Sequence, residues 1–214
     1  MNPSDGFSRL RARKKTGQEP IAGSNCNLLS FWRWAFSDLL GNITRGKLAE
    51  FLVALDIGVA DGVREEWDSF DLTTPEGIKV EVKSSAYLQS WGQNRLSSIV
   101  FGIGPTLTWD ADTGATGGER KRQADVYVLC VLDHRQKRTV DPLDTKHWSF
   151  YVLRSCVLDQ ECGQQKTMTL LRLLELNPLK VEFGGIGLAI RRVWLTDADE
   201  PPAQGSGFPP AGGA

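Results

Sequence analysis

Residues 71–83 read DLTTPEGIKVEVK, and this stretch decides the fold that we expect for the chain. Its middle part, residues 73–77, carries proline and glycine at positions typical of a turn. The segments on either side, Val63–Leu72 and Ile78–Lys83, are rich enough in apolar residues to form strands. The sequence therefore predicts a β-hairpin with its turn at 73–77.

The second strand of this hairpin separates apolar from charged side chains. Because successive side chains point to opposite faces of a strand, the apolar residues at 78, 80 and 82 should face a core. The opposite face then carries Lys79, Glu81 and Lys83. A same-face ion pair in solvent is the simpler interpretation of Glu81 and Lys83, and it leaves the acid at position 71 unexplained.

Asp71 ends the first strand, and the hairpin should return it to the side of the second strand. Two carboxylates, Asp71 and Glu81, would then converge beside the amine of Lys83. Hard cations such as Mg²⁺ take oxygen ligands, usually one or two carboxylates together with water and substrate phosphate. The pattern predicts metal-assisted phosphodiester hydrolysis, with Lys83 stabilising transition-state charge. Asp71 as a simple turn acid is one alternative, and Asp68 is the alternative ligand if the register is shifted.

Glu50 is a further candidate, on a helix that we expect at 45–57 with Thr44 as its N-cap. This helix is apolar nearly all round, so Glu50 lies in a mostly buried sector and needs a metal or a lysine as partner. An exposed Glu50 paired with Lys47 or Arg45 is the alternative.

The remaining periodicity predicts an α/β sandwich around a mixed central sheet flanked by helices. We expect a helix at 27–40, a strand or short helix at 97–103, a polar loop at 104–118, a doubly buried strand at 124–132, a strand at 148–153, a helix at 168–176, an edge strand at 180–183 and a closing helix at 185–195. One domain, 26–196, would lie between a disordered basic arm, 1–25, and a disordered tail, 197–214.

The spacing D71-x9-E81-V-K83, with Glu50 upstream and an apolar strand downstream, resembles the PD-(D/E)xK nuclease superfamily. Restriction endonucleases and archaeal Holliday-junction resolvases belong to that superfamily. The run RGKLAE at 45–50 is similar to a helix of the resolvase-like branch, and EVKSSAYLQSW at 81–91 is similar to an extended segment of restriction-like members. Phe70 stands where the motif name has proline. The resemblance covers mainly residues 44–132.

The resemblance implies an αβββαβ core, Mg²⁺ dependence with Mn²⁺ as a substitute, and DNA cleavage. It implies metal ligation by Asp71, Glu81 and the backbone carbonyl of Val82, a catalytic Lys83 and an accessory Glu50. Gln89 corresponds to a glutamine that orients the site in some members. The residues that we expect to contact nucleic acid are Gln89, Arg45, Lys47, Arg120, Lys121 and Arg122.

The composition limits the partners of this chain of 214 residues. Its net charge of −1 excludes a uniformly basic nucleic-acid coat, although local basic runs occur at 9–15 and 120–122. No apolar run fits a membrane helix and no apolar signal core precedes residue 20, so we expect a cytoplasmic protein with reduced cysteines. Cutting both strands of DNA would require two sites, which favours a homodimer.

Two other functions compete with the nuclease. The segment GNITRGK at 41–47 matches a P-loop, but Leu48 stands where the metal-binding Ser or Thr belongs. A catalytically inactive nuclease-like module that binds nucleic acid or a partner is the second alternative. His134 and His147 look isolated in loops. Trp32 and Trp148 look like core residues, and Trp91 and Trp109 fit either packing or base stacking.

Overall fold

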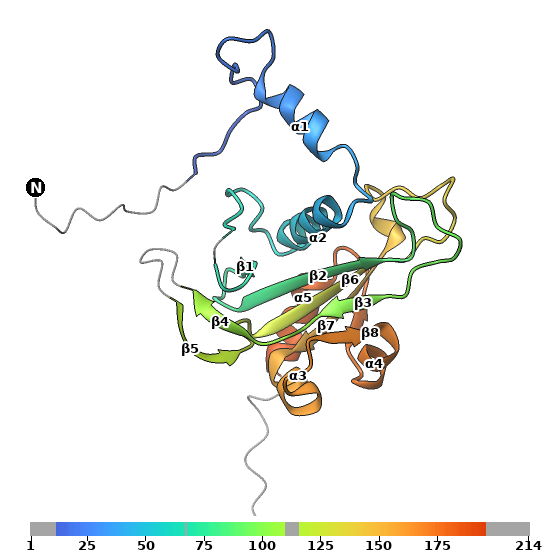
Figure 1. Ribbon diagram of the computed structural model, residues 1–214. Helices are drawn as coiled ribbons and strands as arrows, with labels where there is room; N and C mark the ends of the chain where they lie inside the picture. Colours follow the sequence, from blue (N-terminus) through green and yellow to red (C-terminus); the bar gives the residue numbers. More distant parts are fainter. Residues whose placement is uncertain (1–11, 67, 110–115, 196–214) are drawn as a thin grey trace, which may run out of the picture.

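A five-stranded mixed sheet organises the part of the chain that the computed structural model describes, residues 12–66, 68–109 and 116–195 (Figure 1). Its strand order is β1-β2-β6-β7-β9, with β2 parallel to β6 and the other neighbours antiparallel. The strands are β1 (Leu72–Thr73), β2 (Lys79–Ala86), β6 (Val126–Leu132), β7 (Trp148–Arg154) and β9 (Leu179–Val181). The mixed α/β architecture that the sequence predicted is therefore present.

Both faces of the sheet are covered, which explains why every residue of β6 is buried. Helices α2 (Asn42–Asp56) and α5 (Ile186–Leu195) pack on one face, α2 against the valines of β2 and α5 mainly against β7. The other face carries the small sheet of β3 (Val100–Gly102) and β8 (Thr167–Thr169), with α3 (Ser155–Cys162) and α4 (Leu170–Glu175). Figure 1 shows α2 on one side of the sheet and α3 and α4 on the other.

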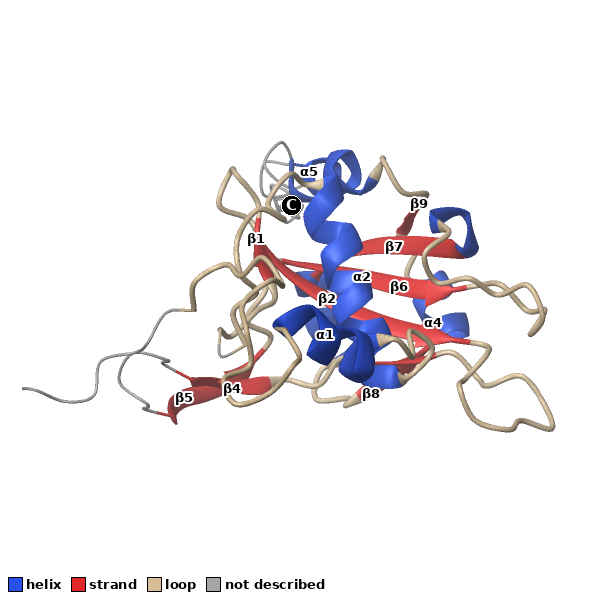
Figure 2. Ribbon diagram, turned by 90° about the horizontal axis from the view of Figure 1, so that it is seen from above, coloured by secondary structure: helices blue, strands red, loops and turns tan. Residues whose placement is uncertain are grey.

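Two parts project from this body. The hairpin of β4 (Thr106–Trp109) and β5 (Thr116–Lys121) extends from one end of the sheet in both views (Figures 1 and 2). Helix α1 (Leu28–Phe36) lies beyond α2 and has no buried residue. The remaining element is the 3-10 helix η1 (Thr145–His147).

Several predicted elements are confirmed. The turn at 73–77, the buried strand β6, the strands β7 and β9 and the closing helix α5 all lie where the sequence placed them. Trp148 and Cys130 are core residues, and all four cysteines are free. Asp56, at the end of α2, accepts a hydrogen bond of 2.8 Å from the backbone N–H of Gly187 and so fixes the start of α5.

The strand predicted at Val63–Leu72 is wrong, since only Leu72 and Thr73 pair with β2. In the described part of residues 59–71, charged side chains turn toward α2 instead, because Arg64 pairs with Glu50 and Glu66 pairs with Lys47. In this segment, ion pairs with side chains of α2 therefore take the place of the predicted backbone pairing with β2.

The helix start predicted at Thr44 is also wrong. The carboxylate of Asp38 accepts hydrogen bonds of 3.1 Å from the backbone N–H groups of Leu40 and Gly41, and α2 begins directly afterwards at Asn42. The segment 41–47 is therefore the first turn of a helix and not a phosphate-binding loop.

Other expectations need correction. The loop predicted at 104–118 contains β4 and part of β5, and α3 and β8 were not predicted. Trp32 belongs to the unburied α1 and is not a core residue. Residues 16–25, assigned to a disordered arm, include a loop closed by a bridge between Pro20 and Asn27. Residues 1–11 of the predicted arm and the predicted tail at 197–214 lie outside the described residues.

The αβββαβ order implied by the resemblance is not established by these elements. In its described residues, the connection from β2 to β6 holds β3, β4 and β5 and no helix. Within the described ranges, no helix has both the length and the apolar character to cross a membrane.

Arg122 supplies a test of the packing between this connection and α3. Its buried guanidinium donates hydrogen bonds to the carbonyls of Ile103 (2.9 Å) and Gly163 (3.0 Å), and to Asp159 (2.6 Å). We expect Arg122→Ala to lower the free energy of unfolding by about 2–4 kcal/mol, because the buried Ile103 carbonyl and the partly buried contacts with Asp159 and Gly163 lose their donor. Exposed Arg120→Ala should change it by less than about 0.5 kcal/mol in the same urea titration. Equal effects of the two substitutions would contradict this role.

Candidate active site

Asp71 is held at the edge of β2 by a backbone hydrogen bond. β1 pairs with β2 only through Leu72 with Val80 and Thr73 with Lys79, so Asp71 lies just beyond the last pair. Its Oδ2 accepts a hydrogen bond of 2.8 Å from the backbone N–H of Val82. The acid is therefore fixed beside the strand that carries the other predicted site residues.

Glu81 and Lys83 lie on the same face of β2, as the alternation predicted. Val80 and Val82, which alternate with them, are buried on the opposite side. The amine of Lys83 is ion-paired with Oε1 of Glu81, and the exposed fractions of these side chains are 34% and 17%. The pair is thus largely withdrawn from solvent, which distinguishes it from an ordinary surface ion pair.

A cavity of about 450 Å³ brings the three side chains together. Asp71, Glu81 and Lys83 line it, and Phe70 and Tyr127 contribute aromatic wall. Tyr127 is the β6 neighbour of Glu81 in the parallel register. Asp68, the alternative acid, lines the same cavity but is exposed. The geometry therefore favours Asp71 as the acid that acts with Glu81.

The carboxylates in this cavity repel one another. Burial, followed by the charges of Glu81 and Glu50, raises the pKa of Asp71 from its ordinary 3.8 to about 7, against the opposing effects of the Val82 amide and Lys83. Burial lowers the pKa of Lys83, but the carboxylates of Glu81, Asp71 and Glu50 outweigh it and leave the pKa raised. Asp71, Glu81 and Glu50 outnumber the bases Lys83 and Arg64, and such an excess of negative charge is a place where a cation would bind favourably.

Glu50 lies near Asp71 from the direction of α2, and its partner is Arg64. The Arg64 guanidinium makes two contacts with the Glu50 carboxylate, one of 3.1 Å from NH2 to Oε1. The same guanidinium lies 3.9 Å from Oδ1 of Asp71 and 3.5 Å from Oε1 of Glu66. The sequence predicted a metal or a lysine as partner of Glu50, or else pairing with Lys47 or Arg45. The side chain that pairs with it is Arg64, so the predicted pairing with Lys47 or Arg45 is wrong, and a metal partner stays a prediction.

Arg64 is the site residue that sequence reasoning missed. It lies in an irregular segment, 14 residues beyond Glu50 in the chain. The one available signal was that a largely buried acid requires a partner, and that signal does not identify which cation of a loop will supply it.

A second cavity, of about 750 Å³, is also lined by the Asp71 segment. Glu50, Arg64, Phe51 and Leu55 line it, and it shares Asp71 with the first cavity. Asp71 is consequently accessible from the side of Glu81 and from the side of Glu50.

The donor atoms at this edge suit a hard cation. Since the Val82 N–H points toward Asp71, the Val82 carbonyl points to the same edge of the strand. Among the described residues, no three His, Cys, Asp or Glu side chains form a group that could hold a metal ion. Asp71, Glu81 and the Val82 carbonyl would therefore leave several positions to water and phosphate, which is how Mg²⁺ is commonly held.

Three of the residues expected to contact nucleic acid are structural instead. Arg45 is only 4% exposed and donates hydrogen bonds to the Leu40 carbonyl (2.9 Å), Asn42 (2.8 Å) and Gln89 (3.2 Å). Gln89 is also buried and donates to the Ala86 carbonyl at 3.0 Å, so these two side chains tie the start of α2 to the end of β2. Arg122 is buried, as described above. Because all three side chains are buried, the prediction that they contact nucleic acid directly is wrong.

The other expected contact residues are accessible. Arg120 and Lys121 are exposed on β5, and Lys47 is partly exposed while donating to Glu66 at 3.1 Å. His134 and His147, expected to be isolated, lie with ring centroids 4.0 Å apart at the opposite end of the sheet strands.

The raised pKa of Asp71 makes stability depend on pH in the metal-free protein. Between about pH 4 and about pH 7 the native state binds a proton that the unfolded chain has released, so the free energy of unfolding should fall as pH rises through this window. Asp71→Asn keeps an acceptor for Val82 and should remove the dependence, making the variant about 2–4 kcal/mol more stable than the wild type at about pH 8. Urea unfolding at several pH values in EDTA measures both curves, and parallel curves would contradict the burial of this charge.

Comparison of the chain with models of protein families, with curated proteins and with solved structures found no match.

Proposed function

We propose that this chain is a Mg²⁺-dependent nuclease that hydrolyses phosphodiester bonds of DNA, with a site of the PD-(D/E)xK kind. The observation that carries the proposal is the meeting of Asp71, Glu81 and Lys83 in one largely buried cavity at the edge of β2. Two carboxylates, a strand carbonyl and an amine are the groups that this reaction requires.

Each residue has a separate part in the proposed reaction. Asp71 and Glu81, with the Val82 carbonyl, would hold the metal ion, and the Val82 N–H keeps the Asp71 carboxylate in place. Bound Mg²⁺ supplies Lewis-acid polarisation of the phosphoryl oxygen and lowers the pKa of water. Lys83 lies on the same strand face as Glu81 and donates a hydrogen bond to the phosphate, where negative charge develops.

A nuclease-like module that binds nucleic acid without cutting is the second candidate. The observation that favours it is that Glu81 is paired with Lys83 and Glu50 with Arg64, so four of the charged groups already have protein partners. Restriction, phage defence and repair all fit the catalytic proposal, and a homodimer would supply the two sites that double-strand cutting requires.

Cleavage of supercoiled plasmid DNA with Mg²⁺ tests the catalytic proposal. Lys83→Met should lower the rate roughly 10²- to 10³-fold, since a donor to the developing charge is lost, and Asp71→Asn should have at least as large an effect. Lys180→Met is the matched control, because this lysine lies on β9 at the far edge of the same sheet, with its amine over the Tyr151 ring. Cleavage by both site variants at the wild-type rate would contradict the assignment.

Calorimetry with Mn²⁺ separates the two candidates without measuring cleavage. The nuclease should bind Mn²⁺, and at about pH 6 it should release close to one proton per ion as Asp71 ionises. Asp71→Asn and Glu81→Gln should abolish the binding heat. Glu76→Gln should not, because this exposed acid of the hairpin turn pairs with Arg191. Absence of Mn²⁺ binding together with salt-dependent DNA binding would favour the inactive module.

A further inference from the structure

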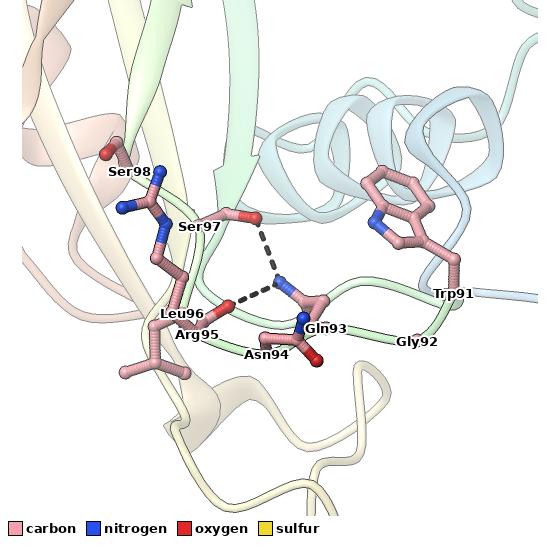
Figure 3. A pocket seen from close by; sticks show the side chains of 8 residues that line it. All are labelled: Trp91, Gly92, Gln93, Asn94, Arg95, Leu96, Ser97 and Ser98. Carbon is pink, nitrogen blue, oxygen red and sulfur yellow. Dashed lines mark hydrogen bonds between the residues drawn. The ribbon is translucent and has the colours of Figure 1, made fainter.

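The loop of residues 87–98, between β2 and β3, is built around the side chain of Gln93. Its Oε1 accepts a hydrogen bond of 2.7 Å from the Gln89 N–H, and its Nε2 donates to the Tyr87 carbonyl at 3.2 Å and to Ser97 Oγ at 3.0 Å. The backbone of Ser97 closes the loop by donating to Tyr87 at 2.9 Å. The loop is thus held in shape by its own amide side chain (Figure 3).

This preformed loop lines an open hollow of about 520 Å³ and presents an exposed aromatic ring beside polar groups. The Trp91 residue is 52% exposed, although a tryptophan gains much from burial. Figure 3 shows the Trp91 ring at one end of the loop and the Arg95 guanidinium at the other, with Gln93 and Asn94 between them. Packing within the described chain does not account for this arrangement.

The surroundings of the loop are basic. Lys137, from the loop that follows β6, donates a hydrogen bond of 3.0 Å to the Trp91 carbonyl. Arg135 of the same segment lies 4.2 Å from the centroid of the Tyr87 ring. Residues 87–98 themselves contain an arginine and no acid. An anionic ligand therefore meets little opposing charge here, apart from Asp133, which lies 3.7 Å from Arg135.

We propose that the loop 87–98 binds an unpaired nucleobase of a single-stranded nucleic acid. Trp91 would provide the face on which the base stacks, Asn94 would offer an amide to its polar edge, and Arg95 and Lys137 would neutralise neighbouring phosphates. Single strands are recognised in this manner, by aromatic stacking next to a positively charged surface. A peptide partner fits less well, because the hollow is lined mainly by amide, hydroxyl and guanidinium groups.

The position of the loop at the end of β2 sets the distance between the nucleobase site and the cavity at Asp71. Six residues of extended chain separate Glu81 from Tyr87, a distance of about 20 Å along β2. That distance corresponds to about six nucleotides at the duplex rise of about 3.4 Å per nucleotide. The inference rests on the proposed function, because it takes nucleic acid as the ligand. It predicts that the preferred substrate is DNA with an unpaired segment several nucleotides from the cut.

Fluorescence anisotropy with labelled oligo(dT) and oligo(U) of about 12 nucleotides, in EDTA to prevent cleavage, tests the site. Trp91→Ala should weaken binding roughly 5- to 150-fold, and Trp91→Phe should retain most of it, because a stacking face remains. Arg95→Gln should reduce the slope of log affinity against log salt by about one. Trp34→Ala is the matched control, because Trp34 is 83% exposed on α1, and it should leave binding unchanged.

The inference would be overturned by equal affinity of Trp91→Ala and wild type, by loss of binding in Trp34→Ala to the same degree, or by failure of both oligonucleotides to bind. Equal affinity for duplex and single strand would also overturn it, since a paired base offers no free face. Comparison of the two oligonucleotides assigns the site to DNA or to RNA. Plasmid cleavage is measured separately, so an inactive protein whose oligonucleotide binding depends on Trp91 would refute the proposed nuclease and retain the nucleobase site.

Discussion

The parallel pairing of β2 with β6 is the constraint on which the other parts depend. The register runs without interruption from Val80 beside Val126 to Ala86 beside Leu132. Two parallel neighbours cannot be joined by a tight turn, so a long connection must leave the end of β2 and return to the start of β6. That connection supplies the loop with Trp91, strand β3 and the hairpin β4–β5, and its residues Gly102 and Gly104 line the cavity that also contains Asp71.

The same pairing determines which charged side chains are enclosed by the fold. β2 presents its valines to α2, so its other face must carry Glu81 and Lys83 toward the covering connection. Asp71 and Glu50 then reach this region from β1 and from α2. Three acids meet two bases, Lys83 and Arg64, in a partly desolvated space, where charge interactions are stronger than in water. Burial of the Asp71 carboxyl, followed by the charges of the neighbouring acids, raises its pKa.

The features that could be predicted from the sequence are those determined by the alternation of side chains along a strand or by a local turn. Alternation identified the buried and charged faces of β2, and turn residues placed Asp71 beside it, because both signals act within a few residues. The partner of Glu50 could not be predicted, since Arg64 reaches it through an irregular segment that no period describes. Arg122 was misassigned because a basic run does not reveal which guanidinium will be buried against carbonyls. The resemblance at 45–50 likewise gave no sign that Arg45 is buried. The exposed α1 had the apolar stripe of a core helix, and only tertiary structure shows that its stripe is not covered.

The ion pair between Glu81 and Lys83 links the charge balance of the metal-free site to the charge balance that a bound cation would produce. In the metal-free protein, Lys83 compensates Glu81, and the Val82 amide holds Asp71 against the repulsion of the other acids. Under the proposed function, a cation between Asp71 and Glu81 would take over the compensation of Glu81, and Lys83 would lose its partner. A largely buried ammonium without an anion is unfavourable, so it would then favour a phosphate oxygen in the same cavity. Cation binding would thus create the binding site for the substrate charge, and the pair that stabilises the free protein would become the reason that metal and phosphate bind together.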